Sequence, residues 1–139
     1  MTTAIIYLVD DEIAVLNSLR DLIESTGLKT KSFLSAAAFL KNYAPAAPGC
    51  LILDIHMPNM GGLELREELA RINNQIPIIF ISGSPEIPES LRAFKTEAVI
   101  FMEKPFNSQL LMANIRTAVA KNLADRQQAL ETRIQETDH

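Results

Sequence analysis

AIIYLVDD, residues 4–11, is a run of apolar residues that ends in two adjacent carboxylates, Asp10 and Asp11. Three later apolar runs also end in polar residues: CLILD at Asp54, IPIIFIS at Ser82 and AVIFMEK at Lys104. Short apolar runs of this kind are typical of strands that are buried on both faces of a parallel sheet. The carboxyl ends of parallel strands open on one edge, where ligands of α/β proteins bind. We therefore expect these polar residues to lie together at that edge.

Segments with helical periodicity separate the apolar runs. Leu16, Leu19 and Ile23 repeat at helical spacing, and Leu65, Leu69 and Ile72 repeat in the same way. KTKSF, residues 29–33, supplies a further strand, which brings the expected number of strands to five. This alternation predicts an α/β fold in which a doubly wound, five-stranded parallel sheet carries helices on both faces.

The helix ends have recognisable signals. Ser35 and Ser108 are expected N-caps, because a serine oxygen accepts hydrogen bonds from the free amides of the first turn. Pro85 and Pro88 bracket the entry to a short fourth helix with few large apolar residues, which makes it a candidate moving part.

The last helix is expected to be long, since neither glycine nor proline follows Ser108. Leu123 and Leu130 stand seven residues apart, as do Gln127 and Ile134. This spacing fits a short coiled-coil seam and equally fits a solvated tail, because a coiled coil normally needs more than about three heptads. We expect one domain over residues 1–122 and a helical extension or linker over residues 123–139.

Composition excludes several classes of protein. The 139 residues are 47% hydrophobic, which suits one domain with its own core. A net charge of -4 argues against direct nucleic acid binding, which needs clustered Lys and Arg. Cys50 cannot form an internal disulfide, because it is the single cysteine, and it is expected in the core. The start of the chain resembles neither a signal peptide nor a membrane span, so a cytoplasmic location is expected.

The polar set indicates phosphoryl chemistry. Three carboxylates in one pocket repel one another unless cations are present. Lys104 supplies one positive charge, and an all-oxygen ligand set selects Mg²⁺ as the second cation. Asp54 is the better nucleophile because it stands alone on its strand, whereas Asp10 and Asp11 are adjacent and suited to hold the metal. Ser82 and Lys104 would donate to the phosphoryl oxygens.

LVDDE, LDIHMPNMGGLEL, FISGS and MEKPF closely resemble the motifs of response-regulator receiver domains of two-component signalling, from about Ile5 to about Val119. The similarity is greatest to the FixJ-like branch. It implies the flavodoxin-like receiver fold, with Asp54 as the phosphorylation site and Lys104 as the invariant lysine. Its other implied assignments are Mg²⁺ ligands at Asp10, Asp11, Asp54 and the backbone carbonyl of His56, a switch hydroxyl at Ser82, a switch aromatic at Phe101, and a cis peptide bond before Pro105.

The resemblance also implies a function. A sensor histidine kinase would donate phosphate to Asp54, and the surface of helix four, strand five and helix five would then change shape. Such a chain is a signalling switch with Mg²⁺-dependent self-phosphorylation and autodephosphorylation, not an enzyme acting on a separate substrate. The expected partners are a transcriptional effector domain in a longer parent chain, for which the resemblance favours the helix-turn-helix type, and a second copy on phosphorylation.

Other functions stay open at this point. A stand-alone receiver would have no effector domain, and a degenerate receiver would act only as an interaction module. A phosphatase of the haloacid-dehalogenase type is a more distant alternative, since it too uses an aspartyl nucleophile and Mg²⁺. That family needs an acid two residues beyond the nucleophile, and His56 occupies this position.

Overall fold

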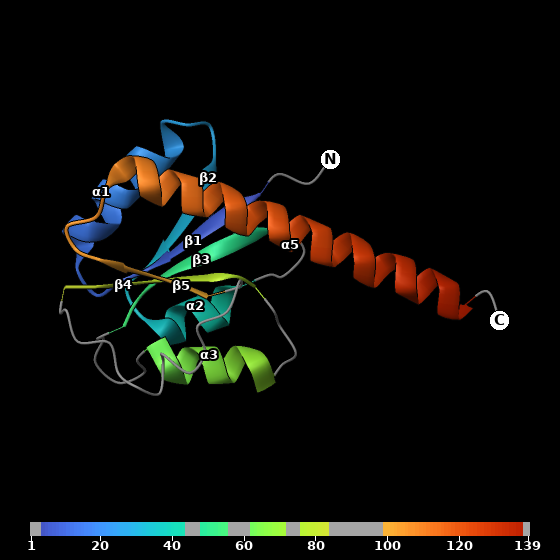
Figure 1. Ribbon diagram of the computed structural model, residues 1–139. Helices are drawn as coiled ribbons and strands as arrows, with labels where there is room; N and C mark the ends of the chain where they lie inside the picture. Colours follow the sequence, from blue (N-terminus) through green and yellow to red (C-terminus); the bar gives the residue numbers. More distant parts are fainter. Residues whose placement is uncertain (1–3, 44–47, 56–61, 72–75, 84–98, 138–139) are drawn as a thin grey trace.

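A computed structural model describes residues 4–43, 48–55, 62–71, 76–83 and 99–137. The described residues form one parallel sheet with the strand order β2-β1-β3-β4-β5 (Figure 1). Its strands are β1 (Ile5–Val9), β2 (Lys29–Phe33), β3 (Gly49–Asp54), β4 (Ile78–Ser82) and β5 (Val99–Glu103). This order is that of a flavodoxin-like, doubly wound sheet, which confirms the predicted fold.

Helices cover both faces of the sheet. α1 (Ile13–Glu24) and α5 (Ser108–Thr137) lie on one face, and α2 (Ala36–Asn42) and α3 (Gly62–Arg71) lie on the other (Figure 1). The expected fourth helix, with Pro85 and Pro88, falls in the segment 84–98, outside the described residues.

The core is divided by the sheet into two layers. Alternate residues of β1 point to opposite faces, so that Ile6 and Leu8 pack with α1 and α5, whereas Tyr7 and Val9 pack with α2 and α3. Every residue of β3 and β4 is buried, as expected of central strands covered on both faces. Cys50 of β3 is fully buried, and burial raises the pKa of its thiol to about 12, so this cysteine is a chemically inert part of the core.

One of the two predicted helix caps is correct. The hydroxyl of Ser35 accepts a hydrogen bond from the amide of Ala38 at 3.1 Å and caps α2. At α5 the cap lies one residue earlier than predicted, because Asn107 Oδ1 accepts from the amide of Leu110 at 3.0 Å. Asparagine caps helices as well as serine does, and the sequence QLLMANI following Ser108 did not distinguish the two positions.

Gly49, the first residue of β3, contacts α5 and lies close to the backbone of β1. Its amide donates to the side-chain carbonyl of Asn122, a buried residue of α5, at 3.0 Å. A methyl group in place of its hydrogen would overlap the backbone carbonyl oxygen of Ile5. Only glycine therefore allows β1 and β3 to approach in this register.

We predict that Gly49→Ala lowers the free energy of unfolding by about 2–3 kcal/mol, because the backbone of β1 has to move to admit the methyl group. Urea unfolding followed by circular dichroism measures the change. Gly83→Ala is the matched control: Gly83 is exposed, its added methyl would have no atom of the described residues within 4 Å, and a change below about 0.5 kcal/mol is expected. Equal unfolding midpoints for the two variants would contradict the close approach at Gly49.

Candidate functional site

The candidate site lies at the point where the strand order reverses. β1 and β3 are neighbours in the sheet, and the chain leaves them toward opposite sides, which creates a crevice at their carboxyl ends. Asp10 directly follows β1, and Asp54 is the last residue of β3. Ser82 ends β4 and Lys104 follows β5, so the fold brings the predicted residues to one edge.

Lys104 connects the two buried carboxylates. Its Nζ lies 3.2 Å from Oδ2 of Asp10 and 3.7 Å from Oδ2 of Asp54. Asp10 is fully buried and Asp54 is 5% exposed, so neither carboxylate is well solvated by bulk water. A cation is therefore needed beside them, and Lys104, which follows β5 and is distant from both in sequence, supplies it.

The protonated, positively charged form of Lys104 is favoured over the neutral form. Burial lowers the pKa of its ammonium, but the carboxylates of Asp10 and Asp54 together raise it more, so the pKa lies above its ordinary value. Lys104 is therefore protonated throughout the physiological pH range. It presents a fixed positive charge to any anion that enters the crevice.

Asp10 belongs to a group of three consecutive carboxylates. Its Oδ1 accepts a hydrogen bond from the amide of Glu12 at 2.9 Å, which fixes the side chain at the start of α1. Single carboxylate oxygens of Asp10, Asp11 and Glu12 lie within 4.8 Å of one another, with Asp11 and Glu12 exposed. These hard oxygen donors fit a divalent cation such as Mg²⁺.

Glu12 is not among the ligands predicted from the sequence. Its signal in the sequence is the third acid of LVDDE. The expected backbone ligand at His56 lies outside the described residues.

Backbone hydrogen bonds hold the ends of β3, β4 and β5 beside one another. The amide of Lys104 donates to the carbonyl of Ser82 at 2.7 Å, and the amide of Ile55 donates to the carbonyl of Ile81 at 3.1 Å. Ser82 itself is buried. The Lys104–Pro105 peptide bond is cis, the isomer that the resemblance implied.

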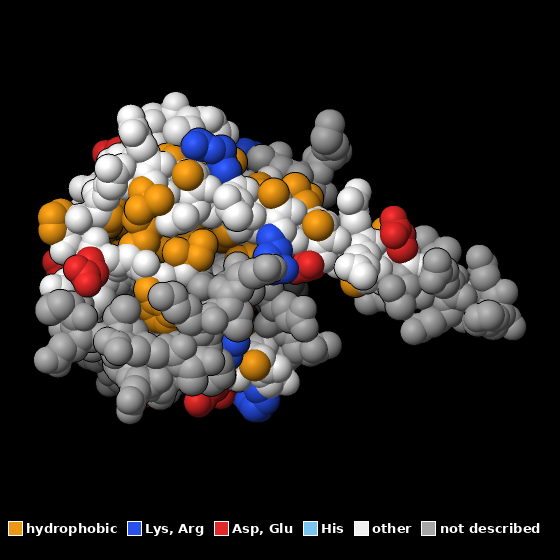
Figure 2. All heavy atoms as spheres, viewed as in Figure 1, with side chains coloured by type: hydrophobic (Ala, Val, Ile, Leu, Met, Phe, Trp, Pro, Cys, Tyr) orange, Lys and Arg blue, Asp and Glu red, His pale blue; other side chains and the backbone are white. Residues whose placement is uncertain are grey.

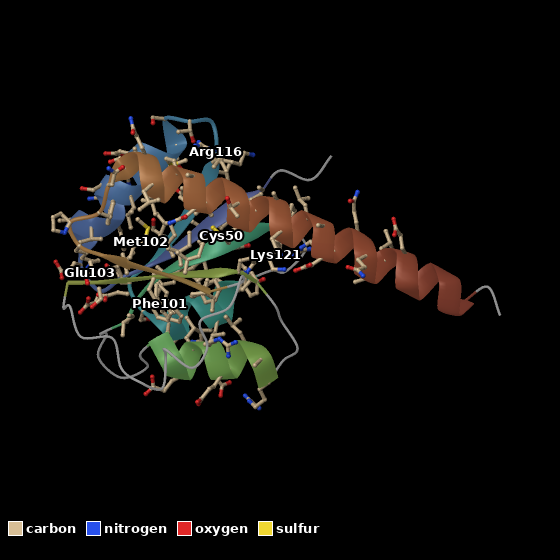
Figure 3. All side chains as sticks on the ribbon, in the orientation of Figure 1. Cys50, Phe101, Met102, Glu103, Arg116 and Lys121 are labelled. Atoms are coloured by element: carbon tan, nitrogen blue, oxygen red, sulfur yellow. The ribbon has the colours of Figure 1, made fainter. Side chains whose placement is uncertain are left out.

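Phe101 lies on the opposite face of β5 from Met102. Its ring stacks on that of Phe80, with centroids 5.3 Å apart and an angle of 16° between the ring planes. Figure 3 shows Phe101 on the side of α2 and α3, whereas Met102 points toward α5. Phe101 is only partly buried, and its partner in the sheet register is Phe80, in the middle of β4.

Comparison with known proteins agrees with this geometry. The family model described as the response regulator receiver domain matches residues 6–116. The chain belongs to this family. It is a receiver domain of the two-component response-regulator type, as the motifs predicted.

Individual relatives give the same result. The response regulator protein TmoT of Ectopseudomonas mendocina is 49% identical over 116 residues, which are 84% of this chain and 53% of TmoT. The solved structure of response regulator StyR matches with a TM-score of 0.86 at 40% identity, covering 96% of this chain and 67% of StyR. The FixJ-N crystal structure matches with a TM-score of 0.75 at 36% identity, covering 86% of this chain and 96% of that one.

This receiver chain spans about half the length of the curated relatives that it matches. In the part of the chain that the structure describes, no helix has the length and apolar character needed to cross a bilayer.

Proposed function

We propose that Asp54 is the phospho-acceptor of this receiver domain. The observation that supports this most strongly is the position of Lys104 Nζ between the carboxylates of Asp10 and Asp54 at the sheet crevice. A carboxylate held beside a fixed cation can attack phosphorus while the charge on the phosphoryl oxygens is neutralised. An oxygen of Asp54 forms the new bond to phosphorus, and the donor group leaves with the electron pair of the bond that breaks.

Each neighbouring residue has a role in this proposal. Asp10 and Asp11 would hold Mg²⁺, together with Asp54 and the carbonyl of His56. Glu12 would add a further carboxylate beside Asp10 and Asp11. The metal supplies positive charge to the phosphoryl oxygens when it is bound. Lys104 and the hydroxyl of Ser82 bind the phosphoryl oxygens directly once the group is attached to Asp54.

Phosphorylation is proposed to act as a switch. A phosphoryl group adds roughly -1.5 to -2 charges at the sheet edge. Ser82 moves toward the new anion, and Phe101, which lies on the neighbouring strand, changes its packing against Phe80. The surface formed by helix four, β5 and α5 then adopts a second shape, as in other two-state switches that a local charge controls.

The partners are proposed from the family. A sensor histidine kinase supplies the phosphate, and the receiver domain, residues 1–122, controls an effector domain in a longer chain through the extension of residues 123–139. The relatives named transcriptional regulatory protein FixJ make a transcriptional effector the preferred choice. Phosphorylation would promote pairing of two receiver domains.

The experiment is intact-mass spectrometry after incubation with acetyl phosphate, with and without Mg²⁺. We predict one added phosphate per chain in the presence of Mg²⁺ and none after chelation with EDTA. Uptake that is independent of Mg²⁺ would contradict the metal assignment. Failure of any phosphate to add, also with a histidine kinase as donor, would favour a degenerate receiver that serves only as an interaction module.

A further inference from the structure

The last part of α5 stands clear of the sheet. α5 runs without interruption from Ser108 to Thr137, and its C-terminal end projects beyond the body of the domain (Figures 1 and 2). We call residues 123–137 the α5 tail. Leu123 is 46% exposed and Leu130 is 56% exposed, although both are large apolar side chains. Exposed leucines at this spacing suggest a surface that another helix covers.

The orientation of the tail is fixed by the domain. The side-chain carbonyl of Asn122, the last buried residue of α5 before the tail, accepts hydrogen bonds from the amide of Gly49 at 3.0 Å and from Nε of Arg126 at 2.9 Å. This side of the helix therefore faces the domain. Because the first half of α5 is packed on the sheet, the tail extends an existing helix and does not bear the cost of helix nucleation.

The exposed leucines belong to one stripe on the other side of the helix. With 3.6 residues per turn, the stripe is about 80° wide and is centred about 120° around the helix from Asn122. From residue 120 onward its described members are Ala120, Leu123, Gln127 and Leu130, and all four are exposed. The intervals between successive residues of the stripe are three, four and three positions, which is the spacing of a coiled-coil seam.

The charges beside the stripe indicate the direction of the partner helix. If Leu123 and Leu130 are d residues and Ala120 and Gln127 are a residues, then Arg126 is a g residue and Glu131 is the following e residue. In a parallel pair, each g residue lies next to the e residue five positions later on the partner. Arg126 would then lie beside Glu131 of the partner subunit, whereas an antiparallel pair would bring two Arg126 side chains together.

We propose that the α5 tails of two copies of this chain form a parallel, in-register coiled coil through this stripe. The seam is short, so the pairing is weak in the isolated chain and becomes populated only at high protein concentration. Gln127 is the second of the two a residues of this stripe, and a polar residue at an a position fixes the register at some cost in stability. This pairing does not depend on phosphorylation of Asp54, so it is tested with the unphosphorylated chain.

Cysteine cross-linking tests the direction and register of the pairing. The buried Cys50 stays inert, so a cysteine introduced in the tail is the reactive thiol of the folded chain. We expect Leu130→Cys to form a covalent dimer on mild oxidation, because d residues of a parallel pair face each other. The matched control is Gln128→Cys, which is also exposed but lies about 120° from the centre of the stripe. Equal cross-linking of the two variants would overturn the proposal.

Charge exchange gives an independent test by sedimentation equilibrium of the 139-residue chain. Glu131→Arg is expected to weaken dimerisation about fivefold, because it places two like-charged pairs in each dimer. Adding Arg126→Glu to that variant should restore the original affinity, since both pairs become opposite in charge again. A chain that stays monomeric at all concentrations, or a double variant weaker than Glu131→Arg alone, would overturn the proposal and indicate that the tail packs on another partner.

Discussion

Asp54→Asn is expected to abolish Mg²⁺-dependent phosphate uptake from acetyl phosphate. Asparagine has nearly the same shape as aspartate, so the strand and its neighbours should be preserved. Its amide oxygen carries no negative charge and does not attack phosphorus as a carboxylate does. The expected loss is complete within the detection limit of intact-mass spectrometry, which is the largest effect that the account predicts.

Asp21→Asn serves as the control for this variant. Asp21 lies on α1, its side chain is well exposed, and it pairs with Arg20 at 3.2 Å on the surface. Uptake by this control should equal that of the natural sequence. Thermal unfolding of both variants establishes that they are folded, and full uptake by a folded Asp54→Asn chain would show that the acceptor is another residue.

Lys104→Met is expected to reduce both stability and phosphorylation. The methionine side chain fills similar space but removes the cation between two buried carboxylates. Breaking such a group by removal of one partner leaves uncompensated charge, and we expect a loss of about 2–3 kcal/mol in the free energy of unfolding at pH 7. We also expect phosphate uptake to fall by about 10²-fold or more, since one positioned cation is lost from the transition state.

The control for Lys104→Met is Lys121→Met. Lys121 pairs with Asp125 at 3.7 Å on α5, and both side chains are partly exposed, so its loss should cost less than about 1 kcal/mol. The contribution of Lys104 to the free energy of unfolding decreases at high pH, because the pKa of Lys104 is raised in the folded state. Its contribution is complete below the ordinary lysine pKa and is lost as the pH rises through the folded value. Urea unfolding at pH 7 measures both variants, and equal losses would contradict the buried role of Lys104.

The sequence was sufficient to predict the sheet and the residues at its edge. Continuous apolar runs, each ending in a polar residue, have few arrangements other than buried parallel strands with their ends aligned. This pattern predicts Asp10, Asp54, Ser82 and Lys104 at one edge of the sheet, and they lie there in the structure. It could not give the distances within the site, because these depend on how the side chains of β1, β3 and β5 pack.

Other features depended on tertiary contacts that a local pattern does not contain. The local sequence fits both Asn107 and Ser108 as the α5 cap, and the hydrogen bond from the amide of Leu110 to Asn107 distinguishes them. The buried role of Asn122 depends on the amide of Gly49, which is 73 residues away in the chain. A polar residue in a helix is normally taken to be exposed, so its partner has to be seen before its role is recognised.

The most direct test of the account is to locate the phosphate itself. Borohydride reduces an aspartyl phosphate to homoserine, so treatment of the phosphorylated chain followed by peptide sequencing in a mass spectrometer marks the acceptor residue. If Asp54 is the acceptor, homoserine is found at position 54, and it forms only when Mg²⁺ and acetyl phosphate are both present. Homoserine at position 10 or 11 in place of 54 would contradict it.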